Sequence, residues 1–155
     1  MIGVVADDIT GANDIGIMFA KSNILTHVYA YDDFSPAKLA NSNDKPEVVI
    51  LDTNSRLDSA QIAFRKVSQA TKSLQASGAS MYINKTCSVF RGNVGAEFDA
   101  MLEALNEDFA VVVLGFPKNG RTTISGVHYV HGKRLELSEF RYDPVHPMTE
   151  SRLAD

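Results

Sequence analysis

The sequence predicts an α/β fold with three layers, in which a mostly parallel sheet is flanked by helices and followed by a C-terminal β-hairpin. Three observations lead to this prediction: short apolar runs, helix-like segments between them, and a change of pattern after Gly120. The apolar runs are Ile2–Ala6, Leu25–Tyr31, Val48–Leu51, Met81–Ile83 and Ala110–Leu114. Continuous apolar runs are typical of strands buried on both faces, and their alternation with helices favours right-handed crossovers in a parallel sheet.

Three segments between these runs have the pattern of amphipathic helices: Gly11–Ser22, Asp58–Ala76 and Gly95–Leu105. In the second helix, four apolar residues are predicted to share one face: Ile62, Val67, Ala70 and Leu74. In the third helix, the corresponding residues are Phe98, Met101, Leu102 and Leu105. Apolar residues at this spacing form the stripe with which a helix packs on a core.

The C-terminal part of the chain indicates a hairpin and then a tail. Val127–Val130 and Arg134–Leu137 flank a turn at His131–Lys133, which contains a glycine. One Asp-Pro pair, at residues 143–144, and one His-Pro pair, at residues 146–147, disfavour helix before each proline. We therefore expect one domain over residues 1–141 and a linker or strap over residues 142–155.

Composition excludes several classes of function. The chain has 155 residues, of which 45% are hydrophobic and 22% are charged, as in an ordinary globular domain that needs no disulfide or structural metal. Its net charge of −4 and its scattered basic residues argue against nucleic acid as a partner. The longest apolar run is far shorter than the roughly 20 residues of a membrane-spanning helix. A single cysteine, Cys87, and an N-terminus without a secretory signal lead us to expect a cytoplasmic protein.

Polar loops follow four of the predicted strands, where ligands bind in open parallel sheets. The four segments are Asp7–Asp14, Asp52–Arg56, Asn84–Thr86 with Ser88 and Arg91–Asn93 beyond it, and Pro117–Thr122. Each residue taken alone could simply cap the helix that follows it. Four such loops on one rim favour a binding site.

Three local motifs are weaker. Gly115–Thr122 has the glycine spacing of a phosphate-binding loop, but Arg121 stands where the motif has lysine, and a hairpin is predicted to follow. His128 and His131 lie three apart on a predicted strand, so they would face opposite ways, and each is expected to be a surface histidine. Cys87 has no neighbouring histidine in sequence and is expected to be a buried structural thiol. No metal site is predicted.

An alternative interpretation is a receiver-like signalling domain. Asp7, Asp8, Asp52, Thr86 and Lys118 occur in the chain order of the acidic, magnesium-binding phosphoacceptor site of such domains, with Asp52 as the acceptor. However, Lys118 follows a proline instead of preceding one, and a hairpin replaces the last helix. A likeness at the level of the fold is weak evidence of function.

Five ordered segments resemble the four-carbon acid sugar kinases, the family that includes threonate and erythronate kinases. They are Ala6–Asp14, Asp52–Arg56, Lys85–Gly95, Phe116–Thr123 and Asp143–Ser151, and together they extend over almost the whole chain. One departure is Cys87, which stands where many members of that family have aspartate. The exact substrate subgroup is therefore open.

The resemblance implies a sugar-acid-binding N-terminal domain of an ATP-dependent kinase. ATP and Mg²⁺ would be bound mainly by a C-terminal nucleotide-binding domain of the same enzyme, which this chain lacks. We therefore expect the chain alone to be an inactive fragment, with a small sugar acid and that second domain as its partners. A homodimer is one assembly that the resemblance leaves open.

The chemistry of a four-carbon acid sugar suggests roles for the residues of these segments. Its carboxylate, and the phosphoryl group to be transferred, call for cations, and its hydroxyls call for carboxylates and hydroxyl or amide groups. Asp8 is the candidate catalytic base that would accept the proton of the attacking hydroxyl. The candidate substrate-binding residues are Asp7, Thr10, Asp14, Ser55, Arg56, Lys85, Ser88, Arg91, Asn119 and Arg121.

Overall fold

A computed structural model describes residues 1–153, which form two compact units. The first unit comprises residues 1–86 and 93–110, and the second comprises residues 87–92 and the chain from residue 111 on. The predicted elements divide between these units, with the parallel sheet in the first and the hairpin in the second.

The first unit is built on a parallel sheet of four strands, β1 (Ile2–Ala6), β2 (Thr26–Ala30), β3 (Val48–Asp52) and β4 (Met81–Lys85). Their order across the sheet is β2-β3-β1-β4, so β1 is an interior strand. In this register Ala6 lies opposite Asp52 on one side and Lys85 on the other. The residues that follow these three strands therefore start from the same edge of the sheet.

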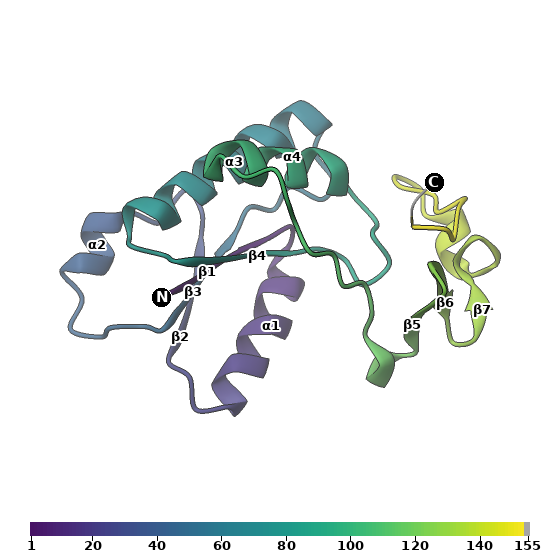
Figure 1. Cartoon of the computed structure of the whole chain (residues 1–155), viewed down its shortest axis with the longest axis horizontal. Coiled ribbons are helices and arrows are strands. Elements are labelled where there is room, and N and C mark those ends of the chain that lie inside the picture. The colour runs from purple at the N-terminus through teal and green to yellow at the C-terminus, as the bar shows by residue number, and fades with distance from the viewer. Residues whose placement is uncertain (154–155) are drawn as a thin grey trace. The chain divides into compact units, whose positions relative to one another are not determined.

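Helices cover both faces of this sheet and make the three predicted layers (Figure 1). Helix α1 (Ile9–Lys21) packs on one face, while α3 (Ala60–Ala76) and α4 (Val94–Leu105) pack on the other. Successive strand residues point to opposite faces, so Val4 packs against α1 and Val5 against α3 and α4. Both faces of the sheet pack against apolar residues, which explains why the strands coincide with continuous apolar runs in the sequence. The short helix α2 (Pro36–Ala40) was not predicted.

The buried stripe of α3 differs from the prediction at one position. Val67, Ala70 and Leu74 are buried as expected, but Ile62 is 37% exposed. At 3.6 residues per turn, Ile62 lies about 140° around the helix from Val67, and Ala63 takes its place in the stripe. None of the helices in residues 1–153 is long and apolar enough to cross a membrane.

The second unit contains a small antiparallel sheet of β5 (Arg121–Ile124), β6 (Val127–Val130) and β7 (Lys133–Arg134). The hairpin predicted around Gly132 is present, although β7 is shorter than expected and continues into a 3-10 turn at Leu135–Leu137. Strand β5 was missed. A tight turn joins it to β6, with positive φ at Ser125 and Gly126, and this Ser-Gly pair was the signal that could have revealed it.

Val89, Val130 and Leu135 form the core of the second unit, and Cys87, Phe140 and Met148 pack against them partly buried. His128 is fully buried, so its prediction as a surface residue was wrong. It lies at an inward position of β6, beside buried Val130 in the alternating pattern.

The tail after residue 141 belongs to the second unit and contacts its sheet and core. The backbone N–H of His128 donates to the carbonyl of Ser151 at 2.8 Å, and Met148 packs on the core. A domain boundary between residues 141 and 142, and a strap toward a further domain, stay predictions. Residues 154 and 155 of the predicted strap lie outside the described residues.

The prediction of a fifth buried strand at Ala110–Leu114 was wrong. The segment has no regular secondary structure, and Val111 and Val113 are 76% and 88% exposed. Only Leu114 is buried. An apolar, β-branched run has the local preference for a strand, but a strand forms only where a neighbour supplies its hydrogen bonds.

Burial of His128 makes a testable prediction about pH. Burial lowers the pKa of this imidazole below 6.5, an effect that nearby Arg121 strengthens and the Ser88 backbone opposes. The unfolded chain therefore binds more protons than the folded chain between the lowered pKa and 6.5. The contribution of His128 to stability is complete above pH 6.5 and is lost as the pH falls from that value through the pKa of the folded state. We expect an NMR titration of the ring protons to show the lowered pKa of His128. Urea unfolding of His128→Gln should lack this part of the pH dependence, whereas exposed His131→Gln should retain it. A titration of His128 at or above pH 6.5 would contradict the prediction.

Candidate functional site

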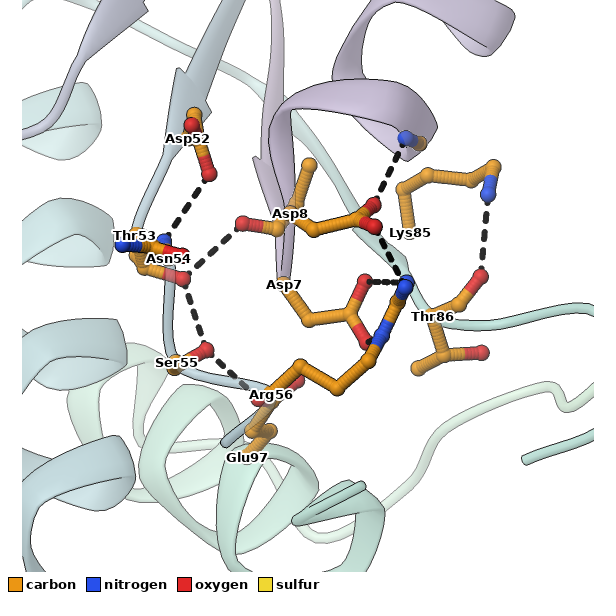
Figure 2. Close-up of polar contacts among 12 residues, drawn as sticks. Asp7, Asp8, Asp52, Thr53, Asn54, Ser55, Arg56, Lys85, Thr86 and Glu97 are labelled. Atoms are coloured by element: carbon orange, nitrogen blue, oxygen red, sulfur yellow. Dashed lines mark hydrogen bonds and ion pairs between the residues drawn. The ribbon is translucent and has the colours of Figure 1, made fainter. Parts of the chain in front are cut away.

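An ion pair between Arg56 and two aspartates lies at the carboxyl edge of the parallel sheet (Figure 2). Asp7 and Asp8 directly follow β1, and Arg56 comes from the loop after β3. The guanidinium donates from Nε and Nη2 to the two carboxylate oxygens of Asp7 at 2.8 and 2.7 Å, and from Nη1 to Asp8. Bidentate pairing of this kind fixes the orientation of both groups.

The two aspartates differ in exposure. The side chain of Asp7 is 2% exposed and both of its oxygens accept from Arg56, whereas that of Asp8 is 22% exposed. Asp8 is also the N-cap of α1, where its Oδ1 accepts from the backbone N–H of Gly11 at 2.7 Å. Asp7 is thus placed to hold Arg56, and Asp8 is the carboxylate that solvent, and hence a ligand, can reach.

The loop that carries Arg56 is anchored at several points. The backbone N–H groups of Ser55 and Arg56 both donate to the carbonyl of Asp7, at 3.0 and 3.2 Å. The side-chain amide of Asn93, the N-cap position of α4, donates to the carbonyls of Ser55 and Asp58, each at 2.9 Å. Asn93 was not among the predicted site residues. These bonds hold Arg56 in place before any ligand binds.

Breaking the ion pair between Arg56 and Asp7 is costly in folding stability because both side chains are largely buried. The side chain of Arg56 is only 12% exposed, so removing either Arg56 or Asp7 would leave an uncompensated charge in a dry environment. Such a loss costs about 3–5 kcal/mol of folding stability.

Lys85 lies beside this group at the end of β4. Its ammonium donates to the carbonyl of Thr86 at 2.9 Å (Figure 2). A Cβ atom at Gly11 would lie 3.1 Å from this ammonium and 2.9 Å from Oδ1 of Asp8. The glycine in the first turn of α1 therefore allows the lysine and the aspartate to approach the helix closely.

Two further carboxyl groups, Asp52 and Glu97, lie near Asp7. Burial raises the pKa of Asp52, a bond from the Asn54 backbone opposes this, and the charges of Asp8 and Asp7 add to it. Glu97, in the first turn of α4, is 1% exposed, and burial raises its pKa as well. The sequence analysis missed Glu97. Its signal was a charged residue four positions before Met101, on the face of α4 that was predicted to be buried.

A second polar group lies within the second unit, around the ring of Phe140. The guanidinium carbons of Arg91 and Arg121 lie 5.8 and 5.4 Å from the ring centroid, within the range of cation–π contacts. Arg91 pairs with Asp143 at 2.7 Å. Arg121 donates to the carbonyl of Asn119 at 2.6 Å and contacts Nε2 of His131 at 2.8 Å. A hydrogen bond from the backbone N–H of His146, which has the largest effect, and one from the side chain of Arg91 lower the pKa of Asp143 to about 2.

The predicted site residues thus fall into two groups and two outliers. The first unit brings together Asp7, Asp8, Ser55, Arg56 and Lys85. The second unit contains Ser88, Arg91, Asn119 and Arg121. Thr10 and Asp14 are exposed on α1. That all of these residues serve one cleft stays a prediction.

The segment considered as a phosphate-binding loop has a different local structure. Pro117–Asn119 form one 3-10 turn, and β5 follows at Arg121. A phosphate-binding loop presents its ligand to the N-terminus of a following α-helix. The described residues of this segment therefore do not fit ATP in that way.

Comparison with protein families and curated proteins gives a consistent result. The family described as "Sugar-binding N-terminal domain" matches residues 2–155. The chain is 34% identical over 153 residues to D-erythronate kinase of Heliobacterium modesticaldum, and 36% identical over 153 residues to D-threonate kinase of Salmonella typhimurium. These alignments cover 98% of this chain but 34% and 35% of the relatives. The chain therefore spans about a third of the length of the curated relatives it matches. The comparisons give no support to the receiver-like alternative.

Solved structures are similar over the same region. One is a domain of unknown function from Bordetella bronchiseptica, a domain-swapped dimer with bound citrate, at TM-score 0.89 and 33% identity, covering 99% of this chain and 38% of that one. Another is a Haemophilus influenzae protein at TM-score 0.82 and 32% identity, covering 97% and 36%. Because the family match extends over residues 2–155, this chain belongs to the family of sugar-binding N-terminal domains, which its relatives among the four-carbon acid sugar kinases also contain.

Proposed function

We propose that this chain is the substrate-binding part of an ATP-dependent kinase that phosphorylates a four-carbon acid sugar such as threonate or erythronate. The observation that carries the proposal is the group of Asp8, Asp7 and Arg56 at the carboxyl edge of the sheet. Ligands of open parallel sheets bind at this edge. The names of the curated relatives supply the substrate class.

Asp8 is the proposed base of the reaction. It combines partial exposure with a fixed orientation, because Arg56 and the N-terminus of α1 hold its two oxygens. A substrate hydroxyl bound at its exposed side could pass its proton to this carboxylate as the oxygen attacks phosphorus. Asp7, which is buried against Arg56, would act through that arginine and not by contact with the sugar acid.

Arg91 and Arg121 are the proposed ligands of negative charge. Both guanidinium groups lie near Phe140, and Arg91 is oriented by Asp143. A planar guanidinium matches the geometry of a carboxylate or a phosphoryl group. The Bordetella relative has bound citrate, which is a carboxylate ligand. Thr10, Asp14, Ser55, Lys85, Ser88 and Asn119 remain proposed substrate-binding residues.

ATP and Mg²⁺ belong to the proposal as groups held mainly by the remainder of the enzyme. The relatives are about three times as long as the matched region, which leaves room for a nucleotide-binding domain there. Two further parts of the proposal are a cytoplasmic location, which a single cysteine favours, and a homodimer as one assembly.

The first prediction from this proposal concerns the isolated chain. Purified residues 1–155 should not transfer phosphate from ATP to threonate or erythronate, because phosphoryl transfer depends on nucleotide and magnesium held in position. The measurement is ³¹P NMR of the sugar acid, with the enzyme that contains this chain as the positive control. Phosphorylation by the isolated chain would contradict the division of labour proposed here.

The second prediction tests the base. Asn is as good an N-cap as Asp, so Asp8→Asn should preserve the start of α1 while it removes the proton acceptor. In the enzyme, kcat should fall about 10²–10⁴-fold, the usual contribution of a general base. Asp99→Asn, at an exposed position of α4, makes the same change outside the proposed site and should keep most of kcat. If the two variants have equal activity, Asp8 is not the base.

The third prediction tests the arginine pair of the second unit. Arg91→Ala should weaken binding of the sugar acid by about 1.5–3 kcal/mol, the scale of a hydrogen bond to a charged group. The side chain of Arg91 is 27% exposed and ion-paired, so the folded state must be checked by circular dichroism. Arg141→Ala removes an exposed arginine from the same unit and should bind normally in isothermal titration calorimetry. An unchanged affinity in Arg91→Ala would remove Arg91 from the site.

A further inference from the structure

Glu97 is a buried carboxyl group for which the proposed reaction has no use. It lies in the first turn of α4 with 1% of its surface exposed. Its Oε1 atom is 2.7 Å from the hydroxyl oxygen of Ser55, directly before Arg56 in the chain (Figure 2). A buried carboxylate is costly unless a charge or several hydrogen bonds compensate it. Its protonation state therefore matters for the loop that carries Arg56.

The contacts around Ser55 form a chain of oxygen atoms, and the number of hydrogens available between these atoms is limited. Thr53 Oγ1 lies 2.9 Å from the carbonyl oxygen of Ala6, and 2.8 Å from Ser55 Oγ. Ser55 Oγ in turn lies 2.7 Å from Glu97 Oε1. All three separations are those of O–H···O hydrogen bonds, in which one hydrogen lies between the two oxygens. The carbonyl oxygen of Ala6 also accepts from the backbone N–H of Thr53 at 2.9 Å.

The two hydroxyl groups supply only two of these three hydrogens. A hydroxyl donates once, and a backbone carbonyl oxygen cannot donate at all. If Thr53 donates to Ala6, then Ser55 must donate to Thr53, and the hydrogen between Ser55 and Glu97 has to come from the carboxyl group. With an ionised Glu97, one of the three contacts would bring two oxygens together without a hydrogen.

We propose that Glu97 is a neutral carboxylic acid in the folded protein, and that it donates its proton to Ser55 and thereby positions the loop that presents Arg56 to Asp7 and Asp8. The hydrogen-bond chain then runs from α4 through Ser55 and Thr53 to the end of β1 at Ala6. Glu97 is a positioning residue, because it acts on the site through Ser55 and Arg56. The inference about its proton does not depend on which sugar acid the enzyme uses.

The surrounding charges agree with a neutral Glu97. Asp7, at the end of β1, is one charged group near Glu97, and its negative charge raises the pKa of Glu97. Arg56, from the loop after β3, is the other, and its positive charge lowers this pKa. Burial has the largest effect and raises the pKa, and the contact with Ser55 opposes it. Arg56 is already shared by two carboxylates, and Lys66 on the neighbouring helix α3 is paired with Asp58 at 2.6 Å.

The polar side chain that faces Glu97 from β4 is Asn84. It also lowers the pKa of Glu97, although neither of its amide atoms makes a hydrogen bond of standard geometry. The net direction is upward from the ordinary value of 4.5. Ionisation would place one more negative charge next to Asp7 and would break the chain of hydrogen bonds.

The raised pKa of Glu97 determines how folding stability changes with pH. A raised pKa in the folded state means that the folded protein keeps a proton that the unfolded chain loses above pH 4.5. The contribution of Glu97 to stability is therefore complete below pH 4.5 and is lost as the pH rises through the pKa of the folded state. Glutamine has a similar shape and an N–H that can donate to Ser55 at every pH, so Glu97→Gln should lack this loss.

The direct test is NMR titration of the ¹³C-labelled side-chain carboxyl groups of the wild-type chain, which needs no variant. The proposal expects the Glu97 carboxyl to titrate above 4.5. Titration at or below that value would overturn it.

Urea unfolding provides the second test. Through the window above pH 4.5, the folding equilibrium constant of Glu97→Gln relative to wild type should rise by up to tenfold per pH unit, the limit for one proton. Glu103→Gln makes the same change at an exposed position of α4 and should show no such trend. A flat ratio for Glu97→Gln would refute the proposal.

The positioning role has its own readout in the enzyme that contains this chain. Glu97→Gln should retain the wild-type KM for the sugar acid, whereas Glu97→Ala, which cannot donate to Ser55, should raise KM. Equal KM values in all three proteins would refute the positioning role. If the enzyme proves to phosphorylate no sugar acid, the proposed function fails, while the titration and unfolding results still decide the state of Glu97.

Discussion

The buried ion pair between Arg56 and Asp7 is the interaction on which the candidate site depends. It joins the end of β1 to the loop after β3, two segments about fifty residues apart that the parallel register brings to one edge of the sheet. A guanidinium held on both oxygens of one carboxylate cannot turn freely, so it also fixes Asp8. The site is therefore preorganised, and preorganised groups lose less conformational entropy when a ligand binds.

The pair depends in turn on the N-cap and the first turn of α4. The side-chain amide of Asn93 donates to the carbonyls of Ser55 and Asp58, and Glu97 contacts the hydroxyl group of Ser55. A buried polar network of this kind is stabilising only when every member is satisfied. This requirement connects the packing of α4 on the sheet to the position of Asp8, although α4 contributes no residue to the proposed reaction.

Much of the fold was predictable because its determinants are local. The run Ile2–Ala6 became β1 with the predicted bounds, since both faces of an interior parallel strand are apolar. The run Ala110–Leu114 is also apolar and rich in valine but is not a strand, because no other described segment pairs with it. The second case shows that composition sets the preference for a strand, whereas pairing decides whether one forms.

The candidate site divides in the same way. The sequence alone determined that Asp7 and Asp8 follow a buried strand and precede a helix, because strand runs and N-cap residues are local patterns. Only the tertiary structure decided that Arg56 pairs with both of them, that Asp7 is buried while Asp8 is accessible, and that Glu97 lies beneath Ser55. These facts depend on which distant segments meet and on how much water their contact excludes. Neither property belongs to any one stretch of the chain.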